Sequence, residues 1–157
     1  MNEINEFFAL VANIGVLGGL VFLGIEVQQN SNLMRAEIRQ GVTENSNTTN
    51  SAIAESLEVA DIVIRAAIGD VEPGPTGEWM VFRSVAAISF RNAENELYLF
   101  EQGLYNEEEY RARLQTIRRN METPGFRSAW DELGNMHSQK FQDVIEQLIL
   151  EVGEIEA

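Results

Sequence analysis

The stretch FFALVANIGVLGGLVFLGI, residues 7–25, decides the fold of this chain. It contains no charged residue, and Asn13 is its one strongly polar side chain. As an α-helix these nineteen residues would extend about 28 Å, close to the thickness of the hydrocarbon core of a bilayer. We therefore predict a transmembrane helix over residues 7–29, preceded by a short leader at residues 1–6.

The flanks of this stretch favour a retained anchor over a cleaved signal peptide. A signal peptide begins with positive charges and ends in a small-residue cleavage site. Here the leader MNEINE is acidic, and the apolar run ends in GIEVQQN. The remaining alternative for so apolar a stretch is a helix buried in a protein core.

The placement of basic residues predicts the orientation of the span. No Lys or Arg precedes it, whereas Arg35 and Arg39 follow within its flank. Because positive charges stay on the cytoplasmic side, we expect the N-terminus outside and the rest of the chain in the cytoplasm. This would be a single-pass membrane protein.

Composition excludes several classes of partner and chemistry. Of the 157 residues, 25 are acidic and 11 basic, which gives a net charge of −14. Such a surface repels nucleic acid and anionic lipid headgroups. It serves solubility, or it recruits a basic partner. The absence of cysteine excludes disulfides, thiolate metal sites and cysteine nucleophiles.

Residues 30–55 form the segment between the predicted span and the helical bundle. They are predicted to be a polar juxtamembrane helix or stalk. Their run TENSNTTNS, residues 43–51, is poor in helix formers and by itself indicates a linker. As a helix, this segment would bury only a thin stripe through Ala52 and Ile53.

Residues 56–157 are predicted to form a soluble helical bundle, because capping residues alternate with helical apolar stripes. The expected first residues or caps are Ser56, Thr76, Asn106, Pro124 and Ser138. The longest stripe comprises Trp79, Phe82, Ala86, Phe90, Ala93, Leu97 and Phe100, and we expect it to be core rather than a ligand pocket. No stretch alternates with period two. The predicted fold class is all-α, with one N-terminal transmembrane helix continuing into a soluble antiparallel helical bundle.

The sequence contains no motif typical of a catalytic, metal-binding or cofactor-binding site. His137 is its single histidine and has no Glu three residues before it, as a helical di-metal site would require. We expect His137 to be a solvated or capping residue in a connector, and the arginines to form surface ion pairs. The sequence therefore predicts no catalytic residue, no metal ligand and no cofactor, and favours a protein that is not an enzyme.

The candidate functional site lies within the span. Ala12, Gly15 and Gly19 form a small-residue face, and Gly15-x-x-x-Gly19 matches a motif for close packing of membrane helices. Asn13 would lie in hydrocarbon, where its amide needs a partner. The pattern predicts association of this helix with itself or with another membrane protein. Glycine is also common in membrane helices that do not associate.

The order of these features resembles a functionally uncharacterised family of bacterial single-span membrane proteins. The matching text is GVLGGLVFLGIEVQQN and MRAEIRQ, then FRNAENELYLFEQGLYNEEEY and TPGFRSAWDE. The resemblance implies that residues 43–51 are more helical than their propensities suggest. It brings no activity and no functional residue.

Three functions fit these expectations. The first is a membrane-anchored, self-associating interaction or scaffold protein. The second is an oligomeric pore whose spans surround a path near Asn13. The third is an accessory subunit of a larger membrane complex, which differs from the first only in its partner.

Overall fold

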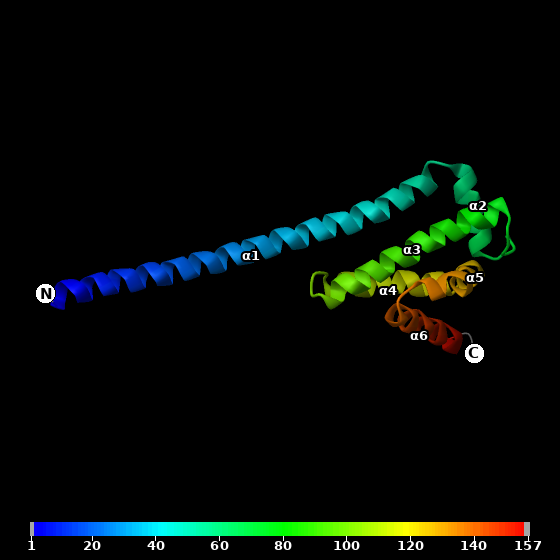
Figure 1. Cartoon of the computed structure of the whole chain (residues 1–157). Helices are drawn as coiled ribbons and strands as arrows, with labels where there is room; N and C mark the ends of the chain where they lie inside the picture. Colours follow the sequence, from blue (N-terminus) through cyan, green and yellow to red (C-terminus); the bar gives the residue numbers. More distant parts are fainter. Residues whose placement is uncertain (1, 156–157) are drawn as a thin grey trace. The chain divides into compact units, whose positions relative to one another are not determined.

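The computed structural model describes residues 2–155, and every regular element in that range is helical (Figure 1). The elements are α1 (Asn2–Ala54), α2 (Leu57–Ala67), α3 (Gly77–Glu101), α4 (Glu107–Met121), α5 (Pro124–Leu133), the 3₁₀ turn η1 (Gly134–Met136) and α6 (Gln139–Ile155). The predicted all-α class is confirmed. The chain divides into two compact units between Ile38 and Arg39, and we call the second unit the helical domain.

The first unit is a single helical segment, the N-terminal part of α1. The most apolar 18-residue window of α1 has a mean hydropathy of 2.3, and none of that window is buried within the structure. Helix α1 is therefore long and apolar enough to span a membrane.

Helix α1 continues without a break through residues 43–51, so the linker interpretation of that run is wrong. The hydroxyls of Thr43, Thr48 and Thr49 each donate a hydrogen bond to the carbonyl four residues earlier, at 2.9, 2.9 and 3.2 Å. These hydroxyls are thus satisfied by their own helix instead of competing with it.

Packing within the helical domain also favours the helical state of this polar segment. One face of it is half-buried, made of Val42, Ser46, Thr49 and Ile53 at helical spacing. The Arg39 guanidinium forms an ion pair of 2.6 Å with Glu109 of α4. This partial burial overrides intrinsic propensities that are weak in any case.

Capping residues begin the later helices where the sequence predicted them. Ser56 Oγ accepts a hydrogen bond from the Val59 N–H at 3.3 Å, and Thr76 Oγ1 accepts from Trp79 at 3.2 Å. Asn106 Oδ1 accepts from the Glu108 N–H at 2.7 Å. Each cap satisfies an amide that has no partner inside its helix.

The core of the helical domain is built around the predicted stripe of α3. Phe90 is fully buried and meets Phe126 and Trp130 of α5 edge to face, with centroid distances of 6.1 and 5.1 Å. Six of the seven predicted stripe residues are buried, and Phe100 packs at the edge of the core. The interpretation of this stripe as core is confirmed.

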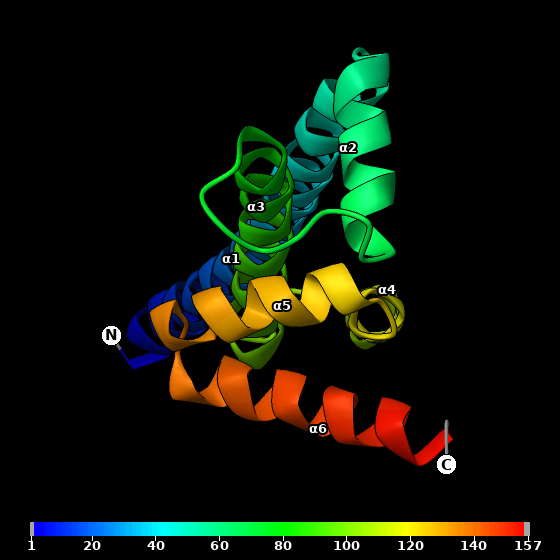
Figure 2. The ribbon, with the colours of Figure 1, turned by 90° about the vertical axis from the view of Figure 1, so that its right-hand side faces the viewer.

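The helices of the domain are arranged as two crossed hairpins. Helices α3 and α4 run antiparallel, and α3 also packs against α2 and α5 (Figure 1). Helices α5 and α6 run in opposite directions, and both cross and pack against α4, which Figure 2 shows end-on. The arrangement thus differs from one simple up-and-down bundle. Helix α5 has only 10 residues, too few to extend along the 25 residues of α3.

Candidate functional site

The predicted association face of α1 is open along its length. Ala12, Gly15 and Gly19 are exposed and recur at spacings of three and four, which places them on one side of the helix. A methyl group added at Gly15 or Gly19 would meet no atom within 4 Å. The same holds at Gly18 and Gly24. Within the first unit, no described side chain therefore occupies this face.

Asn13 borders this face, about 100° around the helix from Ala12. Its side chain is exposed and makes no hydrogen bond within the described residues. In water an exposed amide is satisfied by solvent. In hydrocarbon the same amide would need a polar partner on a neighbouring helix.

The surroundings of these four residues are uniformly apolar. Every large hydrophobic residue from Ile4 to Val27 is 49–65% exposed. A water-soluble monomer rarely exposes a contiguous apolar surface of this extent, which typically marks a membrane or protein contact. The four residues can offer a packing surface and one amide for hydrogen bonding.

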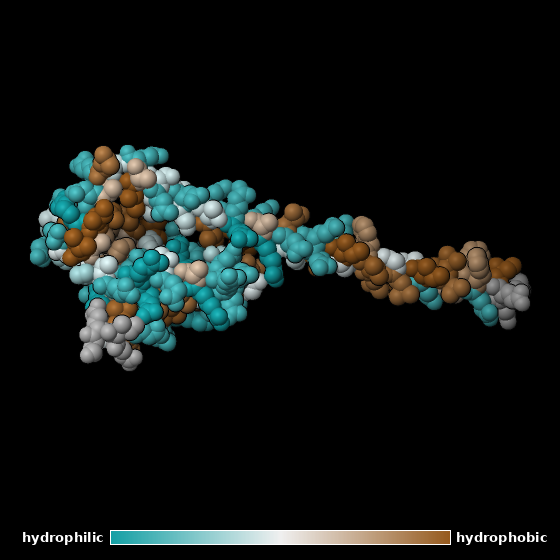
Figure 3. All heavy atoms as spheres, turned by 180° about the vertical axis from the view of Figure 1, so that it is seen from behind, coloured by the Kyte–Doolittle hydropathy of each residue, from teal (hydrophilic) through white to brown (hydrophobic). Residues whose placement is uncertain are grey.

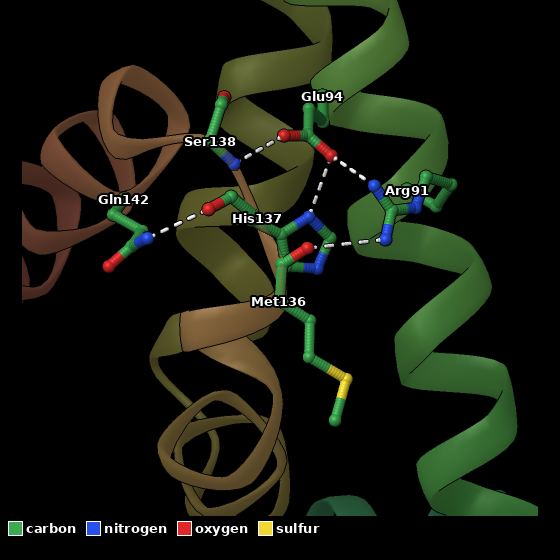
Figure 4. A network of polar contacts seen from close by, with 6 residues as sticks. All are labelled: Arg91, Glu94, Met136, His137, Ser138 and Gln142. Atoms are coloured by element: carbon green, nitrogen blue, oxygen red, sulfur yellow. Dashed lines mark hydrogen bonds and ion pairs between the residues drawn. The ribbon is translucent and has the colours of Figure 1, made fainter.

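A second candidate lies in the helical domain, where Glu94 of α3 meets the connector before α6 (Figure 4). Glu94 Oε2 lies 2.8 Å from His137 Nδ1, and Glu94 Oε1 accepts a hydrogen bond of 2.7 Å from the Ser138 backbone N–H. Arg91 pairs with the same carboxylate at 2.7 Å.

His137 is buried, so the prediction that it is solvated was wrong. Its side chain is only 3% exposed and stacks on Trp130 with a centroid distance of 5.6 Å. The connector that carries His137 turns inward because Trp130, Phe141 and Phe90 surround the ring. Glu94 supplies the one polar partner that a buried imidazole needs.

The electrostatics of this cluster favour an ionised Glu94. Burial opposes ionisation, but the hydrogen bonds from the Ser138 backbone and from His137 outweigh it. Together they hold the pKa of the Glu94 carboxyl below its ordinary value of 4.5. The Gln142 side chain donates to the His137 carbonyl at 2.8 Å (Figure 4). This network joins α3 to the start of α6.

An open cavity of about 480 Å³ adjoins the cluster, and Arg91, Asn95, Tyr98 and Lys140 are among its lining residues. Lys140 already pairs with Glu101, and Arg91 with Glu94. Because the cations that line the cavity are neutralised by neighbouring carboxylates, it offers no net charge to select a ligand. We assign a structural role to the cluster.

The sequence did not reveal a buried ion pair between Glu96 and Arg113. Arg113 donates to Glu96 Oε1 from Nε at 2.8 Å and from Nη2 at 2.5 Å, and the Glu96 side chain is only 3% exposed. The sequence did contain a signal for the burial of Glu96, because this residue falls on the apolar stripe of α3. Burial, together with the charges of Glu96 and Glu109, raises the pKa of nearby Tyr105 to about 12.

The described part of the chain contains no group of three His, Asp or Glu side chains that could hold a metal ion. Comparisons with protein-family models, curated proteins and solved structures find no match for this chain. Ala12, Asn13, Gly15 and Gly19 are exposed, and a methyl group at either glycine would meet no atom within 4 Å.

Proposed function

We propose that this protein is a membrane-anchored, self-associating helical interaction protein. Helix α1 holds it in a bacterial inner membrane, with the N-terminus outside and the helical domain in the cytoplasm. The observation that carries the proposal is the unburied apolar part of α1, where a methyl group added at Gly15 or Gly19 would meet no described side chain of the first unit within 4 Å. The role is assembly on a membrane rather than catalysis.

A helix that spans a bilayer is surrounded by lipid and not by water, and this decides how two such helices can associate. Lipid tails are as apolar as the helix, so no hydrophobic force brings two spans together. Association depends instead on close van der Waals contact and on hydrogen bonds between helices. Gly15 and Gly19 remove side-chain bulk at the contact, and the unbonded amide of Asn13 lies at its border.

The test compares oligomer size in wild type and in Gly19→Leu. Leucine keeps the span hydrophobic, so insertion should be preserved while the close approach is blocked. Val21→Leu is the matched control, because Val21 is exposed on the opposite side of the helix. Native mass spectrometry of all three proteins in one detergent should show a smaller oligomer for Gly19→Leu alone.

Two outcomes would contradict the proposal, the first in its contact face and the second as a whole. An unchanged oligomer in Gly19→Leu would show that these glycines are passive. A wild-type monomer at every concentration, without a co-purifying protein, would remove self-association and the accessory-subunit alternative together. A closed ring that conducts ions would instead favour a pore.

A further inference from the structure

The outward face of α2 is apolar and uncovered. Leu57, Ile64 and Ile68 are 90%, 62% and 59% exposed. Their spacings of seven and four residues place them on one side of the α2 segment, with Asp61 between Leu57 and Ile64. We call Leu57, Ile64 and Ile68 the α2 outer face.

This face is additional to the face with which α2 joins the core. Ile62 and Ala66 are buried, and Val63 packs against the core. A surface helix that needed only one contact would be polar on the other side. Figure 3 shows hydrophobic residues gathered on the visible surface of the helical domain, at the end where α2 lies. The second apolar face of α2 therefore indicates a second contact.

The charged residues in the sequence around the α2 outer face are almost all acidic. Between Glu55 and Glu78 the sequence has six carboxylates and a single basic residue, Arg65. Arg65 is already neutralised by ion pairs with Asp61 at 2.7 Å and Glu78 at 2.6 Å. The four other carboxylates make no ion pair within the described residues: Glu55, Glu58, Asp70 and Glu72.

We propose that the α2 outer face docks an amphipathic helix of another protein whose apolar side chains are flanked by Lys or Arg. Leu57, Ile64 and Ile68 would receive the apolar side chains, and the unpaired carboxylates would pair with the basic flanks. Electrostatic complementarity of this kind selects the partner and speeds its binding. The site is separate from the glycine face of α1 and goes beyond the proposed self-association.

Charge also argues against two other occupants of this face, a second copy of the chain and an anionic membrane surface. Two copies of α2 meeting through this face would bring the same carboxylates together, which opposes their association. An anionic membrane surface would be repelled for the same reason. A basic amphipathic segment is the one class that satisfies both the apolar centre and the acidic rim.

The test uses the full chain in nanodiscs of neutral phosphatidylcholine, with empty nanodiscs as the blank. Two fluorescent model helices serve as probes: a leucine–lysine amphipathic peptide and its leucine–glutamate analogue. The variants are Ile64→Glu and a control, Leu150→Glu, because Leu150 is 69% exposed on α6. Fluorescence anisotropy measures binding, and circular dichroism confirms that each variant keeps its helix content.

We expect the lysine peptide to bind and the glutamate peptide not to bind. Ile64→Glu should weaken binding by about tenfold or more, the effect of losing one central anchor, while Leu150→Glu leaves it unchanged. Gly19→Leu should also leave it unchanged, which separates this site from α1. Equal binding of both peptides, equal affinity in Ile64→Glu, or no binding would overturn the proposal. So would dissociation of a wild-type oligomer by Ile64→Glu, since the occupant would then be a second copy.

Discussion

Gly125, the second residue of α5, lies where α5 crosses the end of α2. A Cβ at this position would lie 2.0 Å from the Ala66 carbonyl oxygen and 2.7 Å from its carbon. Those are backbone atoms, which cannot rotate away as a side chain can. Glycine in a helix is normally unfavourable relative to alanine by about 0.5–1 kcal/mol. The close approach of two helices is the physical reason for its presence here.

We therefore expect Gly125→Ala to lower the free energy of unfolding of the helical domain by about 1–3 kcal/mol, the usual cost of overpacking. Gly153→Ala is the control, because a methyl group there would meet no atom within 4 Å. It should be neutral or slightly stabilising. Both tryptophans lie in the helical domain, so urea unfolding followed by tryptophan fluorescence measures the difference. Equal stability of the two variants would mean that α2 and α5 separate without cost.

The second prediction at the residue scale concerns how the stabilising effect of Glu94 depends on pH. Its pKa in the folded protein lies below the ordinary value of 4.5. Its contribution to stability is thus fully present above about pH 4.5 and is lost as the pH falls through the folded value. Glu94→Gln should cost about 1.5–3 kcal/mol near pH 7, the range for hydrogen bonds to a charged group.

The measurement is urea unfolding of wild type and Glu94→Gln from pH 7 to pH 3. The stability difference should shrink as the pH falls through the lowered pKa of Glu94, because wild-type Glu94 is then protonated. Glu146→Gln is the control, because Glu146 is exposed and makes no ion pair in the described chain. A Glu94→Gln difference that stays constant with pH would mean that the carboxylate charge does not stabilise the cluster.

The residue scale is also where sequence reasoning was weakest. His137 was predicted to be a solvated or capping residue, because a lone histidine in a connector has no local signal for burial. Its partners Glu94 and Phe90 lie more than forty positions earlier in the chain. The need for glycine at position 125 likewise depends on Ala66, which belongs to another helix. Such features require the tertiary arrangement, and no local pattern contains it.

At the scale of the element, the sequence was far more informative. Caps at Ser56, Thr76 and Asn106 act within three residues, so local text suffices to predict them. The apolar stripe of α3 likewise marks its buried face. The exception is residues 43–51, where propensity indicates a linker and the structure has helix. There the hydroxyl bonds and the half-buried face decide, and propensity is too weak a signal to show either.

The prediction at the scale of the element concerns the packing of α3 against α5. Phe90 is fully buried and contacts both Phe126 and Trp130, so Phe90→Ala removes the ring that joins the two helices. We expect a loss of about 3–5 kcal/mol in the free energy of unfolding. Tyr98→Ala on the same helix is the control. Tyr98 is 59% exposed, and its removal should change stability by less than about 0.5 kcal/mol.

Urea unfolding followed by circular dichroism distinguishes these two variants. A Phe90→Ala loss below about 1 kcal/mol would place the ring outside the cooperative core, contrary to its burial. A loss in Tyr98→Ala as large as that in Phe90→Ala would show that α3 is held mainly by its outer side.

At the scale of the whole molecule, the sequence divides into an apolar stretch near the N-terminus and an acidic remainder. Residues 7–25 of α1 are apolar and uncharged, whereas nearly all of the net charge of −14 lies after them; only Glu3 and Glu6 precede them. This division was predictable from the sequence, because it is a property of composition along the chain. The crossing of α5 over the end of α2 was not, because it depends on the contact between Gly125 and Ala66.

The orientation of the chain in a membrane is the last prediction. Positive charges flanking a span stay in the cytoplasm, since moving them across the bilayer is costly. No Lys or Arg precedes the apolar stretch of α1, and Arg35 is the first basic residue after it. Arg39 follows one turn later and is 73% exposed at its side chain. We therefore expect the N-terminus outside and the helical domain inside.

The chain has no cysteine, so a single introduced cysteine can be labelled without background. The two variants are Asn2→Cys near the N-terminus and Leu150→Cys on α6, where Leu150 is 69% exposed. A membrane-impermeant maleimide applied to intact spheroplasts should label Asn2→Cys and spare Leu150→Cys. Both should be labelled once the membrane is opened with detergent, which shows that each thiol is reactive. Labelling of Leu150→Cys alone in intact spheroplasts would reverse the orientation, and the acidic domain would then face away from the cytoplasm.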